Sequence, residues 1–402
     1  MFVAQILPAW CLGVEKFGVF SWLVSVLTVL TFFCAWGTDR FCLKQFSLQS
    51  RSGEMAQCER TLFSTYLLIG VNSLVLAIGF AYYLKVQLPT EYSLLLVGAC
   101  VFVFSSRTFA FVTSSITRGL DLVLQSEFYF GAVRPLVFVV LMAIVYVSGM
   151  LISLTGVLLL LAVSFLVSFV ALYLTNYRTK GLAPKIAWQE TPTLYKSSFF
   201  FFVIGVGMPL LANINTIQLG AIRPSEEVAL FAAAVKLVNL VLLALVSANL
   251  LIAPKLSPLF YSGDLSGMKS LIRGNNGFVA VLTGVPVIAI LLFAEPILRV
   301  FGQKYIAAAP FLRMLVVGQA CSVACGPVIL TATLSGLQNI TAGLVLVVCL
   351  VNWSLCILLI PSLGVMGAVY ASVISNVLVN GGLALIIYVK TGLNVTMLNL
   401  VR

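Results

Sequence analysis

The sequence predicts an all-α polytopic membrane protein, with about twelve transmembrane helices in two pseudo-symmetric six-helix lobes. Two features of the composition predict this class: 61% of the 402 residues are hydrophobic and only 9% are charged. Soluble domains carry about 25% charged residues, so a chain this apolar suits a bilayer better than water. The third observation is a succession of apolar runs, most of them near the ~20 residues that a spanning helix needs.

Eleven apolar runs are long enough to cross a bilayer, and a shorter one precedes them. Residues 1–12 are apolar but too short to cross, so we expect either a truncated first helix or an initiation site upstream of Met1. They also lack the basic region and the cleavage site of a secretory signal. The full spans are expected at residues 17–36, 60–84, 92–116, 128–148, 151–174, 194–217, 228–253, 276–294, 310–333, 341–361 and 366–388.

A long hydrophilic stretch between spans follows the sixth helix and predicts the domain organisation. Residues 1–174 would form an N-terminal lobe, residues 175–193 a cytoplasmic linker, and residues 194–402 a C-terminal lobe. A weak internal repeat agrees with this division. Residues 15–21 and 226–232 both place an acid, a small residue and an aromatic before a long apolar run. Six plus six helices is typical of a duplicated transporter.

Loop charge predicts the orientation in the membrane. Fifteen of the 23 Lys and Arg residues follow even-numbered spans or lie at the C-terminus, and five lie on the other side. The remaining three are Arg107, Lys236 and Arg313, which lie in or at the edge of spans. Because cytoplasmic loops carry an excess of basic residues, we expect a multi-pass membrane protein with both termini in the cytoplasm.

A lysine inside the eighth span is the first candidate for a functional residue. Lys236 lies eight residues past Val228, or about 12 Å along a helix axis. A lysine near a helix centre costs about 2.5–3.5 kcal/mol on insertion scales. Either its ammonium reaches the nearer interface, or it faces a hydrated cavity together with Asn239, one turn away on the same face.

The fourth span ends in a polar stripe that includes two arginines. Arg107, Ser114, Arg118 and Asp121 are spaced by seven, four and three residues, so they share one helix face. Intramembrane charges usually face the interior of a bundle, so we expect Arg107 to line a substrate cavity. The alternative is a contact with a neighbouring helix. Arg118 is a weaker candidate, since an interfacial ion pair with Asp121 would also explain it.

Two further candidates lie on the fifth and seventh spans. Arg134 precedes Pro135, and a proline can kink a helix so that Arg134 points inward; a simple cytoplasmic anchor explains it equally well. Asn213 is polar within a span and would either bond across helices or contact substrate. The predicted substrate-binding residues are therefore Arg107, Lys236, Arg134, Arg118, Asn239 and Asn213.

The sequence lacks the features that several classes of function require. There is no histidine, no C-x-x-C pair and no G-x-x-x-x-G-K-[ST] phosphate loop, so we expect no metal, no cofactor and no ATP hydrolysis. No acid lies deep in a span, whereas ion-coupled drug antiporters usually need one. The predicted periplasmic loops are short, which disfavours an enzyme of glycan assembly. The basic residues of the loops suggest topology rather than nucleic-acid binding.

Four stretches resemble bacterial polysaccharide-unit flippases of the Wzx type, which move O-antigen units. They follow one another in order along essentially the whole chain. Their sequences are LGVEKFGVFS at residues 12–21, APKLSP at 253–258, FGQKYIAAAPFL at 301–312 and IPSLGVMGA at 360–368. This family belongs to the multidrug/oligosaccharidyl-lipid/polysaccharide exporter superfamily, together with drug antiporters and lipid II flippases. The chain departs from the family in its truncated first helix.

The resemblance implies a protein of the bacterial inner membrane, with a V-shaped pair of lobes that works by alternating access. It implies an undecaprenyl-pyrophosphate-linked oligosaccharide, such as an O-antigen unit of lipopolysaccharide, as substrate within the membrane lipids. A polysaccharide polymerase and a chain-length regulator would be its partners. A pyrophosphate needs cations, and we expect Arg107 and Lys236, one from each lobe, to hold it. A drug or cation antiporter, or less favourably a membrane enzyme of glycan assembly, stays an alternative.

The charge bias makes a direct prediction about topology. The loops near Lys44, Lys180 and Lys269 should be cytoplasmic, whereas Arg223 and Lys304 should be periplasmic. The test is labelling of single cysteines, introduced into a cysteine-free background, with a membrane-impermeant reagent added to intact cells. Labelling should occur near residues 223 and 304 only. Labelling near residue 180 would contradict the orientation.

Overall fold

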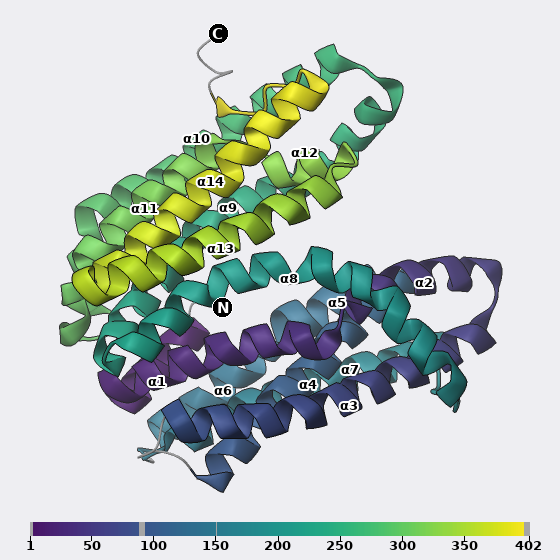
Figure 1. Cartoon of the computed structure of the whole chain (residues 1–402), viewed down its shortest axis with the longest axis horizontal. Helices are drawn as coiled ribbons and strands as arrows, with labels where there is room; N and C mark the ends of the chain where they lie inside the picture. Colours follow the sequence, from purple (N-terminus) through teal and green to yellow (C-terminus); the bar gives the residue numbers. More distant parts are fainter. Residues whose placement is uncertain (1–2, 88–92, 150, 398–402) are drawn as a thin grey trace. The chain divides into compact units, whose positions relative to one another are not determined.

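The computed structural model describes residues 3–87, 93–149 and 151–397, in which the chain is helical and contains no strand (Figure 1). The elements in chain order are α1 (Val3–Ala35), α2 (Thr38–Ser52), α3 (Met55–Gln87), α4 (Leu94–Gly119), α5 (Val123–Ser126), the π-helix η1 (Glu127–Val133), α6 (Arg134–Val147), α7 (Leu154–Lys180), the 3₁₀ helix η2 (Trp188–Glu190), α8 (Thr191–Ile222), α9 (Ser225–Ser262), α10 (Leu265–Arg299), the 3₁₀ helix η3 (Gln303–Ala308), α11 (Ala309–Ala324), α12 (Val328–Leu334), α13 (Gln338–Leu363) and α14 (Val365–Thr391).

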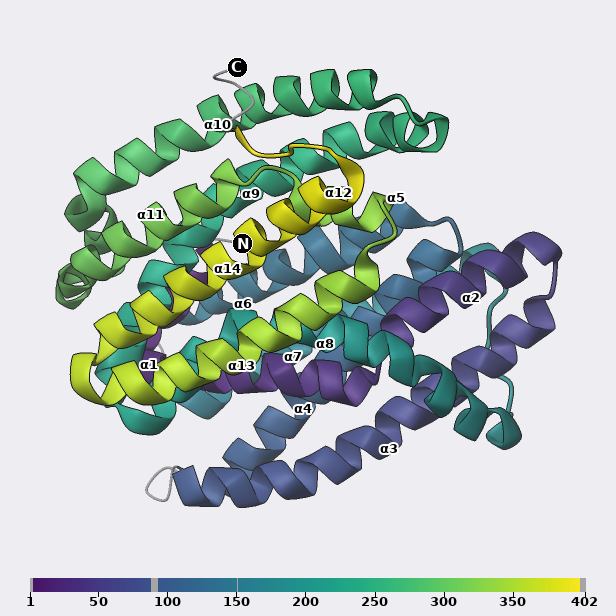
Figure 2. The ribbon, with the colours of Figure 1, turned by 45° about the horizontal axis from the view of Figure 1, so that its top comes forward.

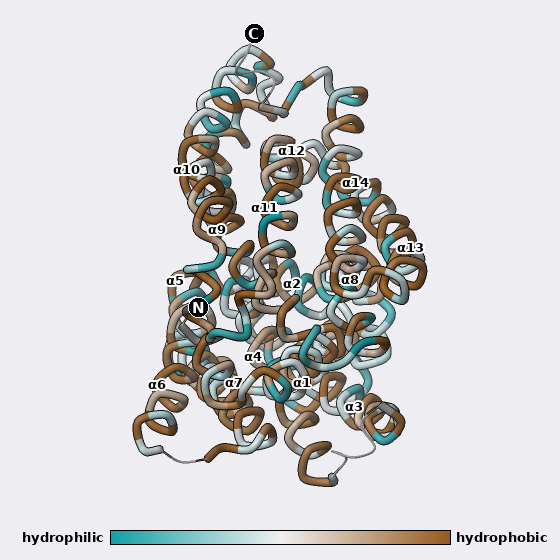
Figure 3. Tube along the Cα trace, turned by 90° about the vertical axis from the view of Figure 1, so that its left-hand side faces the viewer, coloured by the Kyte–Doolittle hydropathy of each residue, from teal (hydrophilic) through white to brown (hydrophobic). Residues whose placement is uncertain are grey.

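The predicted all-α membrane class is confirmed. Within the described residues, ten helices are long and apolar enough to cross a membrane. The predicted full spans fall largely in helical structure, although the span at 128–148 begins in η1 and the span at 310–333 is interrupted between α11 and α12. The span at 92–116 starts outside the described residues, and the span at 151–174 is helical from Leu154 on. Figure 3 shows hydrophobic residues along most of α10 and α13. Large apolar side chains on such faces are exposed, as expected where lipid replaces water.

The first apolar run forms a short helix that joins the next one without a loop. Residues 3–12 and the predicted second span are both parts of α1, and Gly13 between them has φ 72° and ψ 173°. A positive φ suits glycine because it has no Cβ to clash with the backbone. Gly13 therefore turns the chain between a short apolar segment and a full span.

Helix α2 was not predicted, because residues 37–59 read as a charged cytoplasmic loop. The helix is amphipathic. Cys42 and Phe46 are fully buried in a core that also contains Leu62 of α3 and Ile116 of α4, while Lys44 is exposed. Four residues separate the two buried side chains, so they share one face of the helix. The segment is too polar to span a bilayer, yet it forms a helix through tertiary packing.

The chain divides into two compact units, whose helices can be followed in Figures 1 and 2. Unit 1 contains Val3–Lys16 and Leu23–Pro209, and unit 2 contains Phe17–Trp22 and the chain from Leu210 on. In unit 1, α4 packs against α2, α3 and α7. In unit 2, α9, α10, α11 and α14 pack on one another, and α13 packs on α14. The lobes expected at residues 1–174 and 194–402 stay a prediction.

Part of the predicted linker is ordered against unit 1. After α7 ends at Lys180, Leu182 is buried in the same core as Cys42. The Lys185 backbone N–H donates to the Glu59 carbonyl oxygen, and its ammonium lies 3.0 Å from the Glu59 carboxylate. These contacts fix the segment beside the first turns of α3. They thereby place η2 and the start of α8 next to α2 and α3.

Candidate functional site

Helix α4 brings Arg107 into unit 1, where the side chain is half-buried. Its Nη1 donates a hydrogen bond of 2.7 Å to the Thr28 hydroxyl oxygen on α1. The Thr28 hydroxyl donates its own proton to the Val24 carbonyl oxygen, so the lone pairs of the hydroxyl oxygen are free to accept the hydrogen bond from Arg107. A contact with a neighbouring helix, the alternative left open above, is therefore present. It occupies only one of the five N–H groups of the guanidinium.

Arg134 lies next to Arg107 because of an unusual turn. The seven-residue π-helix η1 ends at Val133, and α6 begins at Arg134. Pro135 follows in the first turn of α6, where a missing N–H costs little. π-helices are rare and occur often at functional sites. Here the wide turn sets the direction in which the Arg134 side chain leaves the backbone.

One phenylalanine ring connects the two guanidinium groups. The Cζ of Arg134 lies 4.6 Å from the centroid of Phe130 and 5.0 Å from that of Phe165. The Cζ of Arg107 lies 5.5 Å from the same Phe165 centroid. We call Arg107, Arg134 and Phe165 the arginine pair site. Each cation–π contact stabilises its guanidinium by about 0.5–2 kcal/mol.

The arginine pair site is not neutralised within the described part of the chain. No Asp or Glu described by the structure lies within salt-bridge distance of Arg107 or Arg134. The distance between the two Cζ atoms cannot exceed the sum of their distances to the Phe165 centroid, which are 5.5 Å for Arg107 and 5.0 Å for Arg134. Two positive charges about 10 Å apart repel by about 2 kcal/mol at an effective dielectric constant of ~20. Such a site favours a ligand with negative charge on several oxygen atoms.

Lys236 occupies a comparable position within unit 2. Its Nζ lies 4.7 Å above the ring of Phe17, which is fully buried. None of the ion pairs among the described residues includes this lysine. Asn239, one turn further along α9, is exposed. The ammonium therefore rests on an aromatic face, and an exposed asparagine follows three residues along the helix.

The other predicted binding residues have different surroundings. Arg118 donates to the Ser115 hydroxyl at 3.0 Å, and its Nη1 lies 3.7 Å from the Glu127 carboxylate. Its charge is thus balanced by an acid at the start of η1. Asn213 is half-buried on α8 in unit 2. The structure gathers Arg107 and Arg134 into one site, and it places Arg118 outside that site.

Three contributors to the site were missed by sequence reasoning. Phe165 and Phe130 are two of 28 phenylalanines, and nothing in their spacing distinguishes them from core residues. Thr28 lies in an apolar span, and the one signal around it is a stripe of hydroxyl residues at helical spacing, Ser21, Ser25, Thr28 and Thr31. Within the described residues, no cluster of three or more His, Cys, Asp or Glu side chains could hold a metal ion.

Comparisons with solved structures identify the fold. The chain is similar to an inward-facing multidrug resistance MATE family transporter of the MOP superfamily, with a TM-score of 0.79 and 14% identity over 97% of this chain and 93% of that chain. The lipid II flippase MurJ, in an inward closed conformation, matches with a TM-score of 0.67 and 13% identity over 100% and 88%. A MOP superfamily transporter from Pyrococcus furiosus matches with a TM-score of 0.60 and 14% identity over 97% and 91%. At these identities, the likeness shows the fold.

Comparison with family models identifies the family. No curated protein sequence matches the chain. A family model described as polysaccharide biosynthesis protein matches residues 1–260, well over half of the chain. This chain therefore belongs to the polysaccharide biosynthesis protein family, and it has the helical fold of MOP superfamily transporters.

Proposed function

We propose that this protein is a flippase for an undecaprenyl-pyrophosphate-linked oligosaccharide. It would move an O-antigen unit or a related polysaccharide repeat unit across the bacterial inner membrane by alternating access. The family supports a role in polysaccharide biosynthesis, and the transporter fold supports movement of a substrate rather than catalysis. A polymerase and a chain-length regulator as partners stay predictions.

The arginine pair site is the observation that favours this substrate most. A lipid that crosses a membrane with a pyrophosphate must exchange the water around its charges for protein donors. The guanidinium groups of Arg107 and Arg134 offer planar donor pairs that match phosphate oxygens. Lys236 offers a third cation, in unit 2. Uncompensated positive charges would repel a cationic drug, which disfavours the antiporter alternative.

The first prediction for this function concerns Arg107. Arg107→Ala should weaken binding of undecaprenyl pyrophosphate by about 10- to 100-fold, because a hydrogen bond to a charged group contributes about 1.5–3 kcal/mol. Arg107→Lys should retain more affinity than Arg107→Ala, since it keeps the positive charge. Affinity is measured on the purified protein in lipid nanodiscs, and function by glycan display in a flippase-null strain.

The matched control for Arg107 is Arg178→Ala, which removes an exposed arginine from the last turn of α7 in the same unit. This variant should bind the lipid like the wild type. Removal of an intramembrane cation does not hinder helix insertion, so all variants should reach normal levels in the membrane. Full affinity and full glycan display of Arg107→Ala at normal expression would refute the assignment.

The second prediction concerns Lys236. Lys236→Ala should insert normally and restore glycan display poorly, because a cation that contacts the substrate is lost. Lys236→Glu should be worse than Lys236→Ala, since a carboxylate would repel the pyrophosphate. Lys390→Ala serves as the control, because Lys390 is an exposed lysine at the end of α14. If Lys236→Glu displays as much glycan as Lys390→Ala at equal expression, Lys236 does not contact the substrate and its ammonium only anchors the helix in the membrane.

A further inference from the structure

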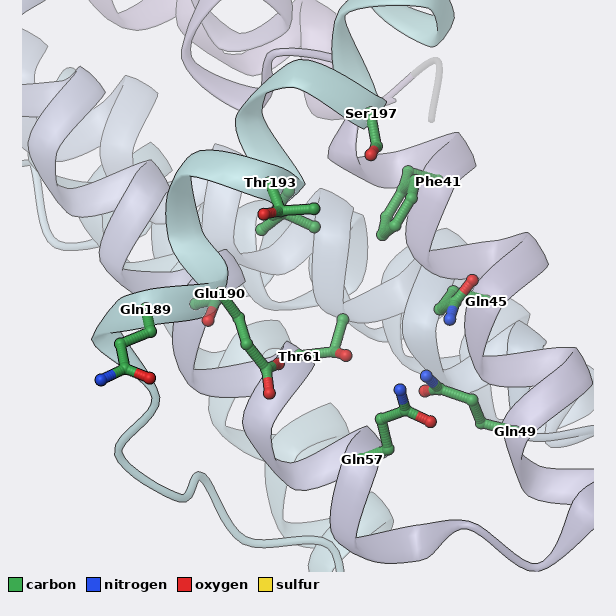
Figure 4. Close-up of a pocket in the computed structure, with 11 residues that line it drawn as sticks. Phe41, Gln45, Gln49, Gln57, Thr61, Gln189, Glu190, Thr193 and Ser197 are labelled. Atoms are coloured by element: carbon green, nitrogen blue, oxygen red, sulfur yellow. The ribbon is translucent and has the colours of Figure 1, made fainter.

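A cavity of about 340 Å³ in unit 1 is lined by eleven residues, of which eight have uncharged polar side chains and two, Phe41 and Leu194, are apolar. It lies between α2, the first turns of α3, η2 and the first turns of α8, and Figure 4 shows its lining. Ligand pockets range over about 300–1,000 Å³, so the space suits one small group. Its polar lining comprises four glutamines, four hydroxyl residues and one acid: Gln45, Gln49, Gln57, Gln189, Thr61, Ser64, Thr193, Ser197 and Glu190.

The cavity is electrically balanced. Neither Lys nor Arg lines it, and its one carboxylate, on Glu190, lies 3.8 Å from the guanidinium of Arg60. The neighbouring acid Glu59 is paired with Lys185 of the linker. Partly exposed ion pairs of this kind contribute little to stability, about 0–1 kcal/mol, but they leave no net charge at the cavity. A phosphate or a cationic drug therefore finds no counter-charge here.

A buried amide nitrogen of a cavity residue lacks a hydrogen-bond partner among the described residues. Gln49 is only 3% exposed, and its Oε1 accepts a bond from the Cys58 thiol at 3.5 Å. Its Nε2 makes no hydrogen bond with any described group. An unsatisfied buried donor costs about 1–3 kcal/mol, and Nε2 is itself closed off from solvent, so a ligand oxygen relieves this penalty only when the Gln49 side chain turns toward the cavity. Gln49 lines the cavity and lies beside Gln57 in Figure 4.

An aromatic ring completes the cavity. Phe41 of α2 lines it on the same side as Gln45, and Thr193 and Ser197 lie on α8. A glutamine amide supplies two donors and one acceptor, and a hydroxyl supplies one donor and accepts as well. Sugar hydroxyls also donate and accept, and the C–H face of a sugar ring packs on aromatic carbon. The lining thus matches an uncharged, polyhydroxylated ring.

We infer that this cavity binds a neutral sugar residue of the transported glycan, separately from the arginine pair site that holds its charged lipid head. The inference rests on the proposed flippase function, and it adds a determinant of sugar selectivity to it. The cavity lies beside the segments of Lys44 and Lys180, which are predicted to be cytoplasmic, the side from which the proposed transport starts. The glutamine amides would select hydroxyl positions, and Phe41 would select the ring face.

The test compares lipids that differ only in the sugar. The affinity of the full-length protein in nanodiscs is measured for undecaprenyl pyrophosphate, and for the same lipid carrying N-acetylglucosamine or galactose. At least one sugar should raise wild-type affinity by about tenfold, the effect of one or two hydrogen bonds. Gln49→Met and Gln45→Ala should each reduce this gain to about threefold or less. Gln49→Met keeps the buried volume and removes the unsatisfied donor, so it should fold normally.

Two control variants separate the sugar site from the phosphate site. Gln125→Ala removes an exposed glutamine of α5, outside the cavity, and should keep the full gain from the sugar. Arg107→Ala should weaken binding of bare and sugar-bearing lipids alike and leave their ratio unchanged. Equal wild-type affinity for bare and sugar-bearing lipids would overturn the sugar site while the proposed function stands. The same conclusion follows if both cavity variants keep the gain.

A free-sugar titration tests the cavity even if no lipid binds. If no lipid binds, the flippase proposal is refuted but the sugar site is not. Trp188 immediately precedes Gln189 and packs on Phe63 at 5.2 Å between centroids, so a ligand beside it should change tryptophan fluorescence. Millimolar N-acetylglucosamine or galactose should change the fluorescence of the wild type, with a weaker response in Gln49→Met. No response to either sugar, or an equal response in the variant, would refute the sugar site.

Discussion

Positive charge inside an apolar helix bundle, with no carboxylate among the described residues to neutralise it, is the constraint on which this structure depends. Each arginine within a span costs about 2.5–3.5 kcal/mol on insertion scales, and two of them also repel each other. The Thr28 hydroxyl and the rings of Phe130 and Phe165 offset part of this cost. A bound anion would offset the rest. In the proposed function, a phosphate group of the substrate supplies the negative charge that no described carboxylate supplies.

Charge is distributed differently at the two sites of unit 1. The arginine pair site concentrates positive charge on an aromatic ring, whereas the glutamine-lined cavity is balanced by the Arg60–Glu190 pair and offers neutral donors and acceptors. A lipid-linked saccharide has the same division, with a dianionic head and neutral sugar rings. The chemistry of the two sites therefore matches the two halves of one substrate. This correspondence connects the proposed function with the inferred sugar site.

The helices were predictable because bilayer thickness imposes long apolar runs, but the site was predictable only in part. Arg107 stood out because a charge inside a span is costly and rare. The inward direction of Arg134 could not be separated from an anchoring role, because the π-turn before it has no pattern in the sequence. Phe165 looked like any core residue. Helix α2 was missed because its charges resemble those of a loop, although Cys42 and Phe46 lie on one buried face.

The central claim is that Arg107 and Arg134 together recognise a pyrophosphate, and the most direct measurement compares two anionic lipids. Affinities for undecaprenyl pyrophosphate and undecaprenyl monophosphate are measured with the purified protein and with its Arg107→Ala/Arg134→Ala variant. We expect the wild type to prefer the pyrophosphate by at least about tenfold, since a second phosphate adds charge and acceptor oxygens for the second guanidinium. The double variant should lose this preference. Equal wild-type affinity for both lipids, or a preference that survives in the double variant, would contradict the account.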